Sequence, residues 1–116
     1  MAEFASPFQG NIDRKISKDE LIQAVRIDIA AELEAMFLYD SHANATDDPI
    51  ARDILMDIRD EEKLHLGQLI KLLEYLDPEG ANHFMEGYNE AIETINEDKG
   101  QESVATFPST IGSLKK

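Results

Sequence analysis

The sequence contains no cysteine, and this absence excludes several kinds of chemistry. A chain without thiols forms no disulfide, binds no metal through thiolate and has no cysteine nucleophile. A rubrerythrin-type peroxidase is disfavoured for the same reason, because a rubredoxin-like electron-transfer module needs cysteine ligands. The expected location is the cytoplasm, where proteins rarely carry disulfides.

Basic charge and long apolar runs are also scarce. Eleven lysine and arginine residues stand against 24 acidic residues, and the net charge is −13. This balance argues against nucleic acid and anionic membranes as partners, and no apolar run approaches the ~18 residues of a membrane span. The N-terminus, Met1-Ala2-Glu3-Phe4, does not resemble a secretory signal. The acidity suits the attraction of cations, although solubility alone also explains it.

The spacing of apolar residues predicts one small all-α domain. A capping-box pattern opens at Ser17 with Glu20, and Asp48 precedes Pro49 as an N-cap precedes a proline in the first turn. The connection between the first two helices is short, so they should form an antiparallel hairpin. The predicted helices cover residues 17–43, 49–76 and 81–95. The predicted organisation is a flexible arm at 1–16, a helical domain at 17–96 and a flexible tail at 97–116.

Two carboxylates and one imidazole interrupt the apolar stripes of the two long helices. Glu32 lies in the stripe of the first helix, and Glu62 and His65 form a Glu-x-x-His pair in the stripe of the second. A carboxylate on an apolar face is costly to desolvate unless it is paired, protonated or bound to a metal. The hairpin register should place residue 32 opposite about residue 61. Either motif alone occurs by chance, but together they predict ligands of a carboxylate-bridged di-iron site.

One chain supplies only half of such a site. Di-iron carboxylate proteins take a lone Glu from each of two helices and a Glu-x-x-His from each of two others. This sequence has one such pair, so a two-fold dimer should complete both the four-helix bundle and the metal centre. Two copies of Glu32 and Glu62 would carry four negative charges, which two ferrous ions neutralise. The ligand types also accept manganese or zinc.

Other residues near this pattern have more than one interpretation. Tyr39, two turns from Glu32, either donates a hydrogen bond or an electron to the centre or is an ordinary core tyrosine. Glu34 is about 200° around the helix from Glu32 and should not share its site. Glu61 flanks the ligand face, and both acids are interpreted as outer-surface residues with at most a secondary metal role. The remaining histidines, His42 and His83, are interpreted as ordinary.

Several strings resemble the encapsulated ferritins, over both long helices and the extreme C-terminus. They are Glu32-Leu33-Glu34-Ala35, Tyr39-Asp40, Arg59-Asp60-Glu61-Glu62-Lys63 with His65, and Ile111-Gly112-Ser113-Leu114-Lys115-Lys116. The resemblance implies a ferritin-like protomer, iron ligation by Glu32, Glu62 and His65 with Tyr39 beside it, and a decameric ring of dimers. It also implies residence inside an encapsulin shell. The family often has an acid where this chain has Ala31, which weakens an ion-entry site based on Glu34.

The expected function is therefore that of a ferroxidase, which oxidises Fe(II) with dioxygen at a di-iron centre between two subunits. Residues 109–116 should bind the encapsulin shell, because Ile111 and Leu114 are apolar residues that a purely disordered tail does not need. The alternative function is a non-catalytic metal-binding or scaffolding cargo protein. Repeated oxygen consumption separates the two, since a metal buffer saturates at the stoichiometry of its sites.

Overall fold

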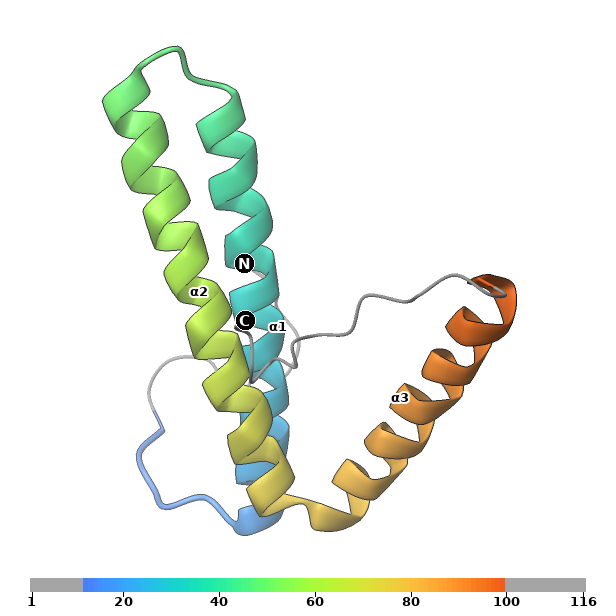
Figure 1. The fold of residues 1–116 in the computed structure, drawn as a ribbon. Coiled ribbons are helices and arrows are strands. Elements are labelled where there is room, and N and C mark those ends of the chain that lie inside the picture. Colours follow the sequence, from blue (N-terminus) through green and yellow to red (C-terminus); the bar gives the residue numbers. More distant parts are fainter. Residues whose placement is uncertain (1–11, 100–116) are drawn as a thin grey trace. The chain divides into compact units, whose positions relative to one another are not determined.

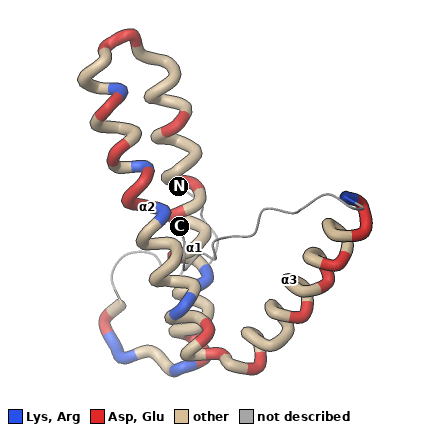
Figure 2. Tube along the Cα trace, in the orientation of Figure 1, with Lys and Arg blue, Asp and Glu red and all other residues tan. Residues whose placement is uncertain are grey.

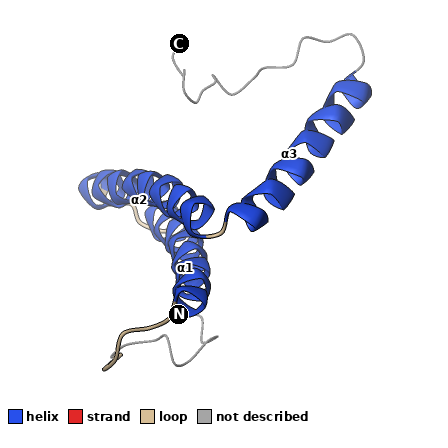
Figure 3. Cartoon of the chain, turned by 90° about the horizontal axis from the view of Figure 1, so that it is seen from below, coloured by secondary structure: helices blue, strands red, loops and turns tan. Residues whose placement is uncertain are grey.

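The computed structural model describes residues 12–99, and every element in that range is a helix. Helix α1 spans Lys18–Asn44, α2 spans Pro49–Leu76 and α3 spans Pro78–Lys99 (Figures 1 and 3). The predicted all-α class is confirmed. The chain divides into two compact units, Met1–Pro78 and Glu79–Lys116, which are described separately. Most of the predicted N-terminal arm and the shell-binding segment 109–116 lie outside the described residues.

Helix α1 begins at the capping box that the sequence predicted. The backbone N–H of Glu20 donates to Ser17 Oγ at 3.1 Å, and the backbone N–H of Ser17 donates to Glu20 Oε1 at 2.8 Å. Arg14 adds two hydrogen bonds from its guanidinium to the same carboxylate, at 2.9 and 2.8 Å. These bonds, first those from Arg14 and then that from Ser17, lower the pKa of Glu20 to about 2. The start of α1 is therefore fixed by local polar contacts.

Helix α2 begins at Asp48, whose side chain accepts hydrogen bonds from the backbone N–H groups of Ile50 and Ala51 at 3.0 and 3.3 Å. Pro49 occupies the first turn, where a missing N–H leaves no hydrogen bond unmade. Because only a few residues separate α1 from α2, the two helices lie antiparallel and side by side (Figure 1). The predicted hairpin is confirmed.

Helix α3 is longer than the sequence predicted. It begins at Pro78 rather than near residue 81 and ends at Lys99 rather than near residue 95, so the predicted helix bounds are wrong, while the division into a domain at 17–96 and a tail at 97–116 stays a prediction. Proline suits the first position of a helix, and Gly87 lies inside the helix with nothing within 4 Å of an added Cβ. Lys99 in the last turn suits the negative end of the helix dipole. The residues of α3 after Ile95 are polar, so the spacing of apolar residues does not reveal that the helix continues to Lys99.

The hairpin buries little of its apolar surface within one chain. Val25, Ala43 and Leu76 are its buried hydrophobic residues. Large side chains stay exposed on both of its helices: Leu33, Phe37, Ile50, Ile54, Leu64 and Tyr75. Contiguous apolar surface of this kind usually marks a protein interface.

Charge is distributed unevenly along the helices (Figure 2). Acidic residues occur on all three, while the basic residue of α3 stands at its end. Within residues 12–99, no helix has both the length and the apolar character that crossing a membrane would require.

Candidate metal centre

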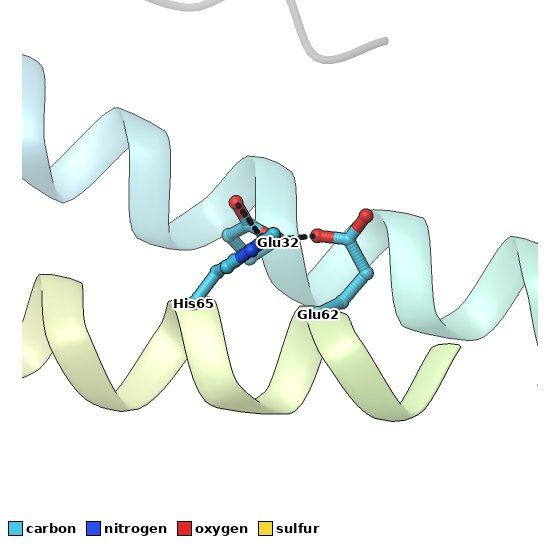
Figure 4. Close-up of side chains that lie close together, drawn as sticks. All are labelled: Glu32, Glu62 and His65. Atoms are coloured by element: carbon cyan, nitrogen blue, oxygen red, sulfur yellow. Dashed lines mark ion pairs between the residues drawn. The ribbon is translucent and has the colours of Figure 1, made fainter. Parts of the chain in front are cut away.

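The hairpin brings Glu32, Glu62 and His65 together, one from α1 and two from α2 (Figure 4). One potential ligand atom from each residue lies within 4.8 Å of the others. His65 Nδ1 is 3.5 Å from Glu62 Oε1 and 3.9 Å from Glu32 Oε2. The predicted opposition of residue 32 and the segment around residue 61 is therefore confirmed, while metal binding by these residues stays a prediction.

Two features of the chain bring these side chains to one place. Glu62 and His65 are three residues apart on α2, so they share one face of the helix. Antiparallel packing against α1 then places Glu32 beside that face. Two arginine–aspartate pairs also link the helices: Arg26 Nη2 contacts Asp77 Oδ2 at 3.2 Å, and Arg59 Nη1 contacts Asp40 Oδ1 at 2.6 Å.

The carboxylates of the cluster are largely removed from solvent. The side chain of Glu32 is 21% exposed and that of Glu62 is 17% exposed, whereas His65 is 53% exposed. Glu32 Oε1 is buried and has no hydrogen-bond partner, and no other side-chain atom of the described residues shares that condition. An unsatisfied buried acceptor costs about 1–3 kcal/mol, and more when the group is charged. The apo protein therefore retains an acceptor that a cation would satisfy.

The donor set fits iron. Carboxylate and imidazole together bind divalent first-row metals, with selectivity set by geometry and by metal availability. Glu32 and Glu62 offer four carboxylate oxygens, of which Glu32 Oε1 lacks any protein donor. His65 offers a ring nitrogen 3.5 Å from one of these carboxylates. The three residues could therefore hold a ferrous ion, and their exposed imidazole leaves one side of the cluster accessible.

A hollow of about 280 Å³ adjoins this cluster. It is lined by Ala31, Glu32, Glu34, Ala35, Leu38 and Glu62. Glu34 borders this hollow together with Glu32, but it is absent from the cluster of three ligand-type residues. The expectation that Glu34 does not share the metal site of Glu32 stays a prediction.

The other predicted residues lie outside the cluster. Tyr39 is half-buried on α1, two turns from Glu32, and does not line the hollow. Glu61 and His42 are exposed. His83 is exposed on α3, where its Nδ1 lies 3.5 Å from Glu86 Oε1. None of these contacts indicates a ligand role.

Two acidic residues of α1 have surroundings that the sequence patterns do not reveal. Desolvation by the surrounding protein raises the pKa of Asp28, which lies one turn before Glu32. Its four-residue spacing from Glu32 is the signal that could have identified it. Asp40 accepts the cross-helix hydrogen bond from Arg59, and no spacing rule within one helix reveals such a partner.

Comparison with known proteins finds relatives of one kind. The sequence matches no family model. It is 34% identical over 130 residues to an encapsulin nanocompartment cargo protein of Myxococcus xanthus, covering 96% of this chain and 97% of that protein. It is 38% identical over 99 residues to a ferritin-like–encapsulin shell fusion protein of Pyrococcus furiosus, covering 80% of this chain and 29% of the fusion. An encapsulated ferritin-like protein of Rhodospirillum rubrum is 34% identical over 89 residues, covering 71% of this chain and 64% of that protein.

A solved structure matches the fold. The crystal structure of the encapsulated ferritin domain from Pyrococcus furiosus superposes with a TM-score of 0.68 at 35% sequence identity. The match covers 88% of this chain and all of that domain. The helical architecture is therefore that of a solved ferritin-like domain.

Proposed function

The chain belongs to the encapsulated ferritin-like proteins, and we propose that it is a ferroxidase that oxidises Fe(II) with dioxygen and supplies ferric iron for storage in an encapsulin compartment. The observation that carries this proposal is the cluster of Glu32, Glu62 and His65 within 4.8 Å, with a buried carboxylate oxygen that lacks a partner. Iron is the substrate of this reaction. Each ferrous ion gives one electron to dioxygen, so two ferrous ions and two protons reduce one dioxygen to hydrogen peroxide, or four ferrous ions and four protons reduce it to two water molecules. The ferric product leaves for the mineral.

The active centre is completed by a second copy of the chain. The stripe of α2 that carries Glu62 and His65 also carries Ile54, Ile58 and Leu72, which are 55%, 37% and 39% exposed. The ligand face is thus apolar and open to solvent in one chain, as an interface would be. A two-fold partner covering it supplies a second Glu32, Glu62 and His65. Four carboxylates then balance the charge of two ferrous ions.

The residues of the centre have distinct roles. Glu32 and Glu62 attract and hold the ferrous ions, and Glu32 Oε1 gains the partner that it lacks in the apo chain. His65 contributes a ring nitrogen of its imidazole as the third ligand. Glu34, at the edge of the hollow, raises the local concentration of cations, and Glu61 is a secondary site on the outer face. Tyr39, two turns from Glu32, donates an electron to the centre.

The names of two relatives support a proposal for the assembly around this centre. One is an encapsulin cargo protein and another is a fusion with an encapsulin shell. We infer that dimers of this chain form a decameric ring and that residues 109–116 attach the ring to a separate shell protein. An open ring cannot retain a mineral, whereas a closed shell can.

An anaerobic titration with ferrous iron followed by oxygen tests the activity. A ferroxidase consumes oxygen repeatedly and oxidises many iron ions per dimer. Glu32→Ala is the matched inactive variant, and Asp57→Ala is the control that removes an exposed acid of α2. If the wild-type protein stops after one filling of its sites, it is a metal-binding cargo protein and the ferroxidase proposal is wrong.

A further inference from the structure

A nearly buried arginine lies one turn before Glu62 on α2. The side chain of Arg59 is only 19% exposed, although arginine is rarely buried unless it is paired. Its Nη1 donates to Asp40 Oδ1 on α1 at 2.6 Å. Its Nε and Nη2 donate to Asp60 Oδ1 on its own helix, at 3.1 and 2.9 Å. The guanidinium is thus held in a fixed position at the seam between the two helices.

The Asp40–Arg59 pair has a counterpart on the other side of the centre. Asp40 lies eight residues after Glu32, about 12 Å along α1, and Arg26 lies six residues before it, about 9 Å. Arg26 contacts Asp77 of α2 at 3.2 Å, with the acid and base exchanged between the helices. Glu32 therefore lies between the two pairs on α1, and Glu62 and His65 lie between them on α2.

Apolar packing alone would fix the register of this hairpin weakly. Only Val25, Ala43 and Leu76 are fully buried, and hydrophobic contact is non-directional. A slip of one helical turn, about 5.4 Å, would remove the 2.6 Å contact between Arg59 and Asp40. The same slip would carry Glu62 and His65 away from Glu32. Polar contacts at a seam can specify register in such cases.

We propose that the Asp40–Arg59 pair is the positioning device of the metal centre, fixing α2 on α1 so that Glu62 and His65 meet Glu32. Arg59 itself binds no metal. This inference rests on the proposed function of the three ligands and adds two residues that act through them. Asp40 and Asp60 also offset the positive charge of Arg59, which would otherwise repel a cation bound one turn away.

Replacing Arg59 with methionine distinguishes a positioning role from a purely electrostatic one, because the two roles change the affinity for a cation in opposite directions. Removing a positive charge near Glu62 should by Coulomb attraction alone tighten the binding of a cation. Loss of register should weaken it, by about tenfold or more, as supporting residues of metal sites commonly do. The sign of the change in affinity therefore decides between them.

The experiment is a titration of the full chain with Co(II), monitored through its visible d–d absorption, without any turnover. Lys71→Met is the matched control, because Lys71 is 81% exposed on the same helix and pairs only along α2 with Glu74. The control should bind Co(II) within about twofold of the wild type, and Arg59→Met at least about tenfold more weakly. Far-UV circular dichroism establishes that each variant is helical. If Arg59→Met does not fold, Arg59→Gln replaces it with the same expectation.

Each outcome has one meaning. Wild-type protein that gives no ligand-field bands with Co(II) refutes the proposed centre itself. Wild-type protein that binds Co(II), together with an Arg59 variant that binds it equally well or more tightly, refutes positioning and leaves the centre intact. Weaker binding by the Arg59 variant but not by Lys71→Met supports the proposal.

Discussion

Glu32→Gln should make the apo protein more stable and the iron-loaded protein less stable than the wild type. Glu32 Oε1 is buried without a hydrogen-bond partner, so the carboxyl group carries an unsatisfied acceptor, which costs more when the group is ionised. Glutamine keeps the shape but cannot ionise. A hydrogen bond to a charged group contributes about 1.5–3 kcal/mol, and one to a neutral group contributes about 0.5–1.5 kcal/mol. An ionised acceptor that lacks its hydrogen bond therefore costs about 1 kcal/mol more than a neutral acceptor that lacks one. The 3.9 Å contact to half-exposed His65 offsets little of this gain.

This gain should be visible in thermal unfolding. For a domain of about 60–100 residues, 1 kcal/mol corresponds to roughly 4–8 °C in Tm. In chelator, we therefore expect Glu32→Gln to unfold several degrees above the wild type at the same protein concentration. Ligand at about 100 times its Kd stabilises a protein by about 2.7 kcal/mol. Anaerobic ferrous iron should therefore raise the Tm of the wild type well above that of the variant, reversing the order.

Asp57→Asn is the control for this prediction. It makes the same carboxylate-to-amide change at an exposed residue of α2, so its Tm should stay close to that of the wild type in both conditions. Circular dichroism at 222 nm during heating, with chelator and with ferrous iron, measures all three proteins. A lower Tm of Glu32→Gln in chelator would contradict the cost assigned to the unpartnered oxygen. An equal rise in Tm with iron in both proteins would show that Glu32 is not a ligand.

Four further predictions follow from the site and the helix ends. His65→Ala should abolish rapid iron oxidation in a stopped-flow assay while leaving the far-UV spectrum helical, because this exposed side chain adds little to packing; oxidation at the wild-type rate would exclude His65 as a ligand. Size-exclusion chromatography at neutral pH should show smaller species in chelator and larger ones with ferrous iron, because four carboxylates would converge at the interface of the proposed dimer; an identical distribution in both would count against that dimer. Deleting residues 109–116 should leave oxidation by the isolated protein unchanged but prevent co-purification with a co-expressed encapsulin shell, and full occupancy of the truncated chain would refute shell binding by this segment. The pKa of Glu20 is lowered from 4.5 to about 2, so its contribution to stability is present above pH 4.5 and is lost as pH falls toward 2; Arg14→Gln should therefore move acid unfolding to higher pH, and an unchanged acid transition would show that the Arg14 contacts add no stability.

Local sequence determined the helices and the identity of the ligand-type residues. Ser17 with Glu20 and Asp48 with Pro49 specify helix starts through hydrogen bonds to nearby backbone groups, so their patterns were sufficient. The spacing of Glu62 and His65 places them on one helix face whatever the rest of the fold does. The short connection between the helices then predicted their meeting with Glu32. The end of α3 escaped prediction because its last residues are helical without an apolar pattern.

The burial of these residues and their contacts across the two helices depend on the tertiary structure alone. The sequence places Arg59 in a charged string beside Glu62, but it does not show that packing leaves this side chain only 19% exposed and pairs it with Asp40 of the facing helix. Glu34 borders the same hollow as Glu32, although the two residues differ by about 200° around the helix. The unpartnered oxygen of Glu32 likewise depends on which donors the second helix brings near it. Helix periodicity is a local property of the chain, whereas burial and pairing across helices depend on register, which a few contacts between distant residues fix.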